Sequence, residues 1–430
     1  MAMWLALSSL ALSFSIIGLQ LGFSYWVSVA SFGALLLVAL FLCSGSGVSN
    51  IKLKRSDLVL LAAAAILSMR ILVEEEEILL LQLRLIFFLY LFTLALLFPL
   101  SGKKLLSFAI VPSIALSAIL ACLFLIISYC VSLIPGGPLN PISIATFHNH
   151  WLVQNKMFEN IDAALLSFKY TSGIARLSLF YGEPSYLSLV MGMCSYIILL
   201  LLSFPLSTLR CLFPRLTYLS RTFLYIVFFL SLCFLLRTLS LIGLLFVVFL
   251  VSYFFFLCPA RAGYSPYRKT MSLIILLIPV FSFAANPMIF SLFTERIISV
   301  LSGTDPSAGG RIYALSYFME NLFGYGSIKS SVLASSDYYQ VDSGIVAHTL
   351  IYGVTFLIYC VFTVNTFRVR FGRFAYWSSY SIYIFLAWSQ NGQIFHLDKF
   401  FLSVLPIPIL VFLVSSCSAS KRHTPGLLAS

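Results

Sequence analysis

Residues 105–134 read LLSFAIVPSIALSAILACLFLIISYCVSLI, and this stretch contains no Asp, Glu, Lys or Arg. About 20 consecutive apolar residues are enough for an α-helix to cross the hydrocarbon core of a bilayer. Because backbone N–H and C=O groups in lipid have to bond within their own segment, such a run is expected to be helical. The stretch also lacks the alternation of apolar and polar residues that is typical of membrane β-barrels. It therefore predicts a membrane-spanning helix.

Similar apolar runs recur along the 430 residues, of which 61% are hydrophobic and 9% charged. An ordinary globular domain has about 25% charged residues. We therefore expect an all-α polytopic integral membrane protein, with about 12 transmembrane helices in a single transmembrane domain over residues 1–430. The expected spans are residues 4–20, 27–43, 57–73, 78–98, 105–134, 184–203, 222–236, 239–257, 271–290, 344–364, 374–388 and 399–415.

The charged residues predict how these spans are oriented. The chain has 26 Lys and Arg against 14 Asp and Glu, a formal net charge of +12. With both termini on one side of the membrane, most of the basic residues fall on that side, and Asp57 is the single acid there. The positive-inside rule makes that side cytoplasmic. The net charge then follows from topology, and we expect no nucleic-acid partner. The basic residues on that side are Lys52, Lys54, Arg55, Lys103, Lys104, Arg210, Arg215, Arg221, Arg261, Arg268, Lys269, Arg368, Arg370, Arg373, Lys421 and Arg422.

Two long polar segments, residues 135–183 and 291–343, interrupt the apolar runs. The first follows the fifth expected span and the second follows the ninth, so both loops lie on the extracytoplasmic side. A membrane protein that only anchors or conducts needs no such loops. We therefore expect the chain to act on a molecule held at this face.

The first loop ends in Gly182-Glu183-Pro184-Ser185-Tyr186, which leads into the sixth span. Pro184 suits a first helical turn, because its missing N–H has no partner to lose there. Two interpretations of Glu183 are open. One is a favourable contact with the helix dipole, worth about 0.3–1 kcal/mol. The other is a carboxylate held at the interface as a general base, with Arg176 nearby for phosphate and Tyr186 as a secondary site residue.

The second loop contains Gly309-Gly310-Arg311, followed by apolar residues at helical spacing that predict an amphipathic helix over residues 311–322 on the membrane surface. Arg311 would stand at the start of this helix. Arginine binds phosphate through two parallel hydrogen bonds, so Arg311 is a candidate for a phosphorylated substrate. The alternative is an interfacial arginine that contacts lipid headgroups.

Further candidates lie at the expected outer ends of other spans. Asp342, in Asp342-Ser343-Gly344, stands at the entrance of the tenth span as a second candidate base or as a dipole contact. His348 follows about a turn later, as a packing residue or a secondary site residue. Arg237 separates the seventh and eighth spans, where it either extends harmlessly to the interface or completes a cationic cluster with Arg176, Arg296 and Arg311.

Common catalytic motifs are absent from the sequence. It contains no nucleotide-binding glycine loop and no His-Glu-x-x-His zinc motif, and His148 and His150 lack a third ligand at convincing spacing. We therefore expect neither a metal nor a cofactor. An enzyme of this kind would need a substrate that arrives already activated, such as a lipid pyrophosphate at the outer leaflet.

Together these features resemble the superfamily of bacterial O-antigen polymerases (Wzy-type) and O-antigen ligases. The likeness in architecture lies in some twelve spans with large outer loops after the fifth and ninth. The local similarities are Arg176…Gly182-Glu183-Pro184-Ser185, Arg237-Thr-Leu-Ser, Arg311…Gly324-Tyr-Gly326 and Asp342-Ser343…Gly353.

The resemblance implies a metal-independent, GT-C-related glycosyltransferase in the bacterial inner membrane, with both termini cytoplasmic and an active site that faces the periplasm. Arg176, Arg237 and Arg311 would hold the pyrophosphate of an undecaprenyl-linked oligosaccharide, and Glu183 or Asp342 would accept the proton of the attacking hydroxyl. Inner-membrane lipids, a chain-length regulator and a flippase are the other implied partners.

Within this superfamily the sequence favours a polymerase for lipopolysaccharide biosynthesis. Ligases usually carry His-Asn where this chain has Asp342-Ser343. An O-antigen ligase that transfers polymer to lipid A-core is the nearest alternative. A flippase or other polysaccharide transporter is the alternative from another class, and it would place charged groups in the middle of several spans.

Overall fold

The structure is a computed structural model. It describes residues 54–74, 79–97, 110–132, 184–204, 206–213, 221–238, 240–257, 291, 294–295, 298, 302, 318–325, 343–390, 394 and 397–422. The expected spans 4–20, 27–43 and 271–290, and most of both long loops, lie outside these residues.

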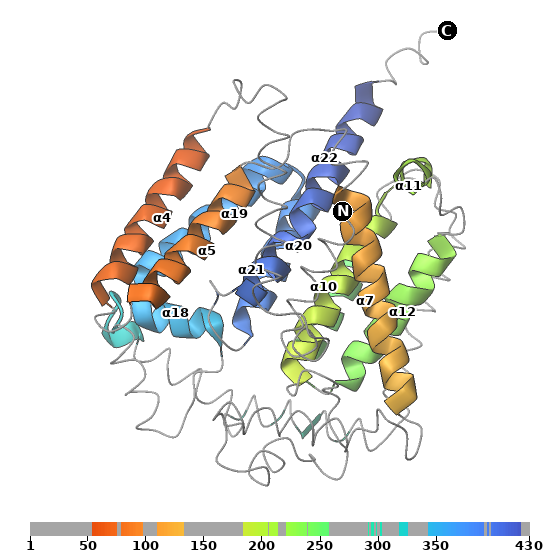
Figure 1. Ribbon diagram of the computed structural model, residues 1–430, viewed down its shortest axis with the longest axis horizontal. Coiled ribbons are helices and arrows are strands. Elements are labelled where there is room, and N and C mark those ends of the chain that lie inside the picture. Colours follow the sequence, from red (N-terminus) through yellow and green to blue (C-terminus); the bar gives the residue numbers. More distant parts are fainter. Residues whose placement is uncertain are drawn as a thin grey trace.

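Every regular element in the described part of the chain is a helix, in agreement with the expected all-α class (Figure 1). The helices are α4 (Arg55–Glu74), α5 (Leu79–Leu97), α7 (Val111–Ser132), α10 (Pro184–Leu202), α11 (Leu206–Leu212), α12 (Arg221–Arg237), α13 (Leu241–Leu257), α18 (Gly344–Tyr352), α19 (Val354–Phe371), α20 (Phe374–Ser389), α21 (Leu397–Val404) and α22 (Pro406–Arg422).

Four of these helices are long and apolar enough to cross a membrane, namely the segments Arg55–Val73, Val111–Val131, Ser185–Leu202 and Val354–Phe371. Leu85–Leu97, Leu241–Phe254 and Leu402–Val414 are shorter apolar helices. The protein therefore has the features of a helical membrane protein. The total of about 12 spans stays a prediction.

Helix α10 is the centre of one half of the bundle, where it packs against α7, α12 and α13. In its span, 89% of the residues are buried inside the protein. In the other half, α4 packs against both α5 and α19. Helix α20 contacts both α13 and α19, so it joins the halves.

Hydroxyl groups connect the helices inside the bundle. Side-chain hydrogen bonds between helices are one of the forces that hold membrane bundles together, because lipid offers these groups no other partner. The bonds are Thr93 Oγ1–Tyr359 Oη (3.0 Å, α5 to α19), Ser195 Oγ–Ser231 Oγ (2.8 Å, α10 to α12) and Tyr196 Oη–Ser379 Oγ (3.0 Å, α10 to α20).

The expected span 344–364 is wrong as a single helix. It breaks at Gly353, which has φ +63°, and α19 continues to Phe371. The cause is a close backbone contact with residues 322–324. Val354 N–H donates to the Leu322 carbonyl (2.7 Å), and a Cβ at Gly353 would lie 2.3 Å from that oxygen. Gly324, with φ +86°, faces Gly353 from the other segment.

The expected span 399–415 is also divided, into α21 and α22. Pro406 has no N–H, so it cannot donate to the Leu402 carbonyl one turn earlier. The Tyr383 hydroxyl donates to this carbonyl instead (2.5 Å), and the Tyr380 hydroxyl donates to the next one, that of Ser403. The Tyr383 hydroxyl thus replaces the backbone donor that Pro406 lacks.

One end of the bundle, here called the basic end, collects most of the described cations. There Arg370 of α19 pairs with Asp57 of α4 (3.4 Å) and also donates to the Leu97 carbonyl of α5. At the same end Arg221 of α12 donates to the Phe204 carbonyl after α10 (2.6 Å). The described cations at this end are Lys54, Arg55, Arg210, Arg221, Arg368, Arg370, Arg373, Lys421 and Arg422.

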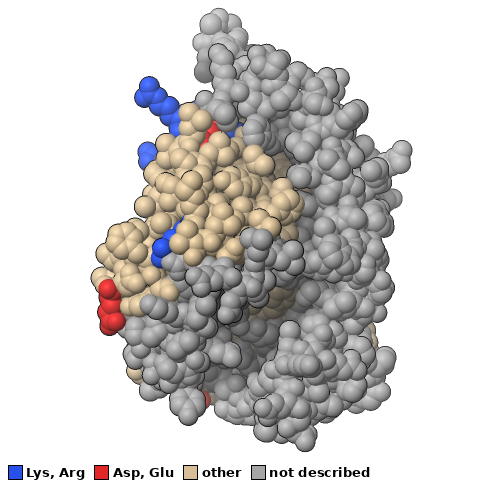
Figure 2. Space-filling model, turned by 60° about the vertical axis from the view of Figure 1, so that its left-hand side comes forward, with Lys and Arg blue, Asp and Glu red and all other residues tan. Residues whose placement is uncertain are grey.

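The described part of the face that includes α4 is mostly uncharged, apart from a cation part-way along it (Figure 2). Leu58, Ile66, Met69 and Val73 of α4 are exposed there, each by more than half. Exposed apolar side chains on a long apolar helix are expected to contact lipid.

Candidate functional site

The structure describes three of the predicted site residues, namely Arg237, His348 and Tyr186. The predicted bases Glu183 and Asp342, and the predicted phosphate-binding residues Arg176, Arg296 and Arg311, lie outside the described residues. Described neighbours of these residues lie together at one end of the bundle.

Gln390, the C-terminal cap of α20, links three helices at the end of the bundle opposite the basic end, here called the Gln390 end. Its carbonyl accepts the N–H of Gly344, the first residue of α18 (3.1 Å), and a hydrogen bond from the ammonium of Lys399 on α21. Its side-chain amide reaches Ser185 Oγ in the first turn of α10 (3.4 Å). The described residues two positions after Glu183 and two positions after Asp342 therefore contact the same residue.

The contact between α18 and α20 has a simple physical reason. The first N–H groups of a helix and its last carbonyls have no partners within the helix. Here the first N–H of α18 and the carbonyl that follows α20 satisfy each other. The negative C-terminal end of the α20 dipole and the positive N-terminal end of the α18 dipole also attract each other at this junction.

Sequence reasoning missed both Gln390 and Lys399. Lys399 is only 3% exposed, although it carries an ammonium group. A usable signal was present, because Lys399 stands beside Phe400 and Phe401 in a mostly apolar stretch. A cation within such a stretch is uncommon and often marks a functional site.

The Arg237-Thr238-Leu239-Ser240 motif forms the turn between α12 and α13. Ser188 of α10 donates to Thr238 Oγ1 (2.8 Å) and bonds with Ser240 Oγ (2.6 Å). Ser240 Oγ in turn accepts the N–H of Gly243 at the start of α13 (2.9 Å), as an N-cap does. The hydroxyls of this motif therefore have a structural role, because they fasten the turn to α10.

Arg237 lies at the Gln390 end with its guanidinium held from one side. Its Nε donates to the hydroxyl of Tyr129 on α7 (3.2 Å), and the Tyr129 ring packs edge-on against Phe234 (5.9 Å between ring centres). Arg237 is partly exposed. The Tyr129 hydroxyl therefore helps to fix the orientation of the Arg237 guanidinium.

His348 is buried on α18, a nine-residue helix that is not among the candidate spans. Its Nδ1 bonds to the Gly344 carbonyl (2.8 Å), and its ring packs against Tyr352 and Phe356. A carbonyl only accepts, so Nδ1 carries a proton. Burial lowers the pKa of His348 to about 4, against the raising effect of the Gly344 bond, and the positive charge of Lys399 lowers it further. His348 is therefore neutral at pH 7, and these contacts favour a packing role.

Tyr186 follows Ser185 in the first turn of α10 and packs against the buried core. Its hydroxyl oxygen is buried as well. This position puts it at the Gln390 end, one residue from the contact with Gln390. Its role as a secondary site residue stays a prediction.

Comparison with known proteins identifies no relative of this chain. No family model, curated protein or solved structure matches the chain. Among the described residues, no three or more His, Cys, Asp or Glu side chains lie close enough to hold a metal. The Gln390 end is therefore interpreted from its own chemistry.

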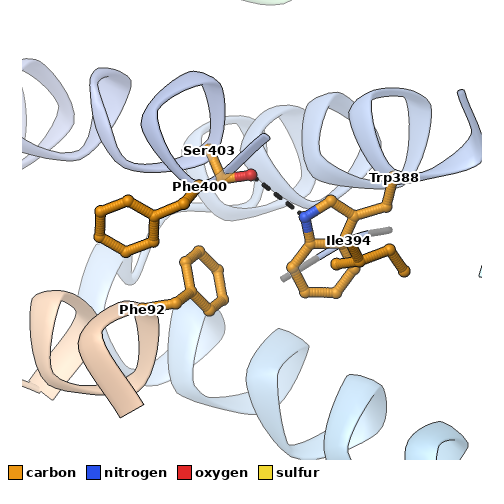
Figure 3. Close-up of a pocket in the computed structure, with 5 residues that line it drawn as sticks. All are labelled: Phe92, Trp388, Ile394, Phe400 and Ser403. Carbon is orange, nitrogen blue, oxygen red and sulfur yellow. Dashed lines mark hydrogen bonds between the residues drawn. The ribbon is translucent and has the colours of Figure 1, made fainter. Parts of the chain in front are cut away.

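A small cavity of about 10 Å³, with room for roughly one water molecule, lies between α5, α20 and α21 (Figure 3). It is lined by Phe92, Trp388, Ile394, Phe400 and Ser403, and the Trp388 indole donates to Ser403 Oγ (3.1 Å). Ligand pockets usually measure about 300–1,000 Å³. The cavity is smaller than that and has no charged side chain, so it does not suit a sugar pyrophosphate.

Proposed function

We propose that this protein is an O-antigen polymerase, a glycosyltransferase of the bacterial inner membrane. It would join undecaprenyl-pyrophosphate-linked repeat units at the periplasmic face, by transfer of the growing chain to the incoming unit. The observation that carries the proposal is the convergence on Gln390. The segments that lead from Glu183 and from Asp342 each place a residue against it, and Arg237 lies at the same end of the bundle.

In the proposed reaction, a hydroxyl of the incoming unit attacks the anomeric carbon of the growing chain. The bond from this carbon to the pyrophosphate oxygen breaks, and undecaprenyl pyrophosphate leaves with the electron pair. Glu183 or Asp342 accepts the hydroxyl proton. Arg237, with Arg176, Arg296 and Arg311, would stabilise the charge on the leaving group, so catalysis would depend on positioning and electrostatics.

The distribution of charge supports a periplasmic site. Cations gather at the basic end, which the positive-inside rule assigns to the cytoplasm. The Gln390 end would then face the periplasm, where lipid-linked repeat units are displayed. Both termini would be cytoplasmic in this orientation.

The described helices give less support to a transporter. Charged residues of α4, α12 and α19 lie near the helix ends, and α7, α10, α13 and α20 contain none, whereas α5 contains Arg84 and α21 contains Asp398 and Lys399. Hydroxyls bond to one another between the helices, whereas the buried ionisable groups Asp57, His348 and Lys399 lie toward the two ends of the bundle. Transport pathways commonly place ionisable groups near the midplane.

A lipopolysaccharide gel of the host tests the proposal when the gene is deleted and then restored. A polymerase predicts that deletion leaves lipid A-core with a single repeat unit and removes the ladder, because ligation continues. Complementation with Glu183→Gln or Asp342→Asn should fail for whichever carboxylate is the base, at unchanged protein levels. Loss of every repeat-bearing band, with long lipid-linked chains accumulating, would instead indicate a ligase.

A further inference from the structure

Lys399 is the buried cation at the Gln390 end. Its side chain is 3% exposed, its ammonium donates to the Gln390 carbonyl, and its charge acts on the buried ring of His348. Lysine often caps a helix C-terminus at the surface. Here the capped carbonyl and the lysine are both inside the protein.

A neutral donor would satisfy the same carbonyl at a lower cost. A carbonyl oxygen has two lone pairs, and at Gln390 the N–H of Gly344 and the ammonium of Lys399 occupy both. Burial of an ammonium group costs several kcal/mol in desolvation. A hydrogen bond with a charged donor is stronger and shorter than a neutral one. The charged ammonium of Lys399 is therefore consistent with a junction that needs a strong hydrogen bond at the Gln390 carbonyl.

The junction connects segments that are far apart in the sequence. Through the Gln390 carbonyl, Lys399 fixes the start of α18, and through the Gln390 side chain it reaches Ser185 at the start of α10. We propose that Lys399 is a positioning residue, which holds the starts of α10 and α18 together at Gln390 and thereby fixes the points at which the chain enters both helices. This inference rests on the proposed polymerase function.

The test compares Lys399→Met, Lys399→Arg and the matched control Ser403→Ala in the full-length protein in vesicles. Ser403 is buried one turn further along α21, and its hydroxyl accepts the Trp388 N–H and donates to the Lys399 carbonyl. The control therefore loses buried hydrogen bonds without touching Gln390. Turnover is measured per folded molecule at saturating lipid-linked donor, and hydrogen exchange is measured over residues 344–347.

We expect Lys399→Met to lower turnover roughly 10- to 100-fold, the scale of a small misplacement of reacting groups, at an unchanged KM. It should also lose protection at the start of α18. Lys399→Arg should retain most of the turnover and most of the protection. Ser403→Ala should have the same turnover per folded molecule as the unaltered protein. Normal turnover per folded Lys399→Met molecule, or an equal loss in Ser403→Ala, would overturn the inference.

The two proposals fail in different ways. If the unaltered protein transfers no oligosaccharide from lipid pyrophosphate, the polymerase function is wrong. Hydrogen exchange then still reports on the junction, because it needs no substrate. If the unaltered protein is active and Lys399→Met exchanges like it, only the positioning role is wrong.

Discussion

At the residue scale, the Tyr129 hydroxyl controls the orientation of the Arg237 guanidinium. Its Nε donates to the Tyr129 hydroxyl (3.2 Å), and this bond orients the guanidinium. Tyr129→Phe removes the hydroxyl and keeps the ring against Phe234. We expect the KM for the lipid-linked donor to rise several-fold, in line with a hydrogen bond worth about 0.5–1.5 kcal/mol.

A double-mutant cycle is the control for this prediction. In an Arg237→Met background, Tyr129→Phe should have no further effect on KM, because the group that it orients is absent. The same rise in both backgrounds would mean that Tyr129 acts on something other than Arg237.

His348 predicts a dependence of stability on pH. Its pKa of about 4 in the folded protein is below the unfolded value of 6.5, so the unfolded chain binds the proton more readily. The stability associated with neutral His348 is present above pH 6.5 and is lost as pH falls towards 4. We expect the Tm in detergent to fall over this range.

His348→Asn is the matched variant, since the Asn amide can donate to the Gly344 carbonyl and does not titrate. Its Tm should fall less over the same pH range. Equal slopes in both proteins would assign the pH dependence to other groups.

At the scale of elements, the break between α18 and α19 depends on Gly353. Its φ of +63° and ψ of −144° are accessible to glycine, and a Cβ there would strike the backbone of residues 322–324. Gly353→Ala should therefore sharply reduce the yield of folded protein and its Tm. Gly372→Ala is the control, because Gly372 has a similar φ of +66° and nothing within 4 Å of its Cβ position.

Gly372→Ala should show only the cost of the backbone conformation, about 1–3 kcal/mol. The loss of stability in Gly353→Ala should be larger, because the backbone at residue 353 has to separate from residues 322–324. Equal losses in the two variants would mean that the contact with residues 322–324 contributes little to stability.

At the scale of the whole molecule, the separation of charge predicts orientation. Arg373, in the turn between α19 and α20, and Glu320 are both exposed, at the basic end and near the Gln390 end respectively. In a chain whose nine cysteines are replaced by serine, Glu320→Cys should react with an impermeant thiol reagent in intact spheroplasts. Arg373→Cys should react only after lysis. The reverse pattern would place the Gln390 end in the cytoplasm and exclude a periplasmic site.

The sequence alone determined the class of protein and the approximate place of most described helices. Apolar runs long enough for a bilayer leave the backbone no alternative to helix, so the expected spans at 57–73, 184–203 and 374–388 agree closely with α4, α10 and α20. The grouping of cations at one end was also readable, because it follows from residue order once the spans are known. Gly324 and Gly353 stood in motifs of the family resemblance, and these motifs predicted nothing of the contact between the two glycines.

The tertiary structure alone decided what those local patterns do. The breaks at Gly353 and Pro406 depend on partners from other segments, namely the backbone near Leu322 and the hydroxyl of Tyr383. The same holds for Gln390 and Lys399, which stand in no motif and gain their importance from contacts with α10 and α18. Hydropathy predicts which segments can lie in lipid. Long-range hydrogen bonds between buried groups depend on which segments the fold brings together.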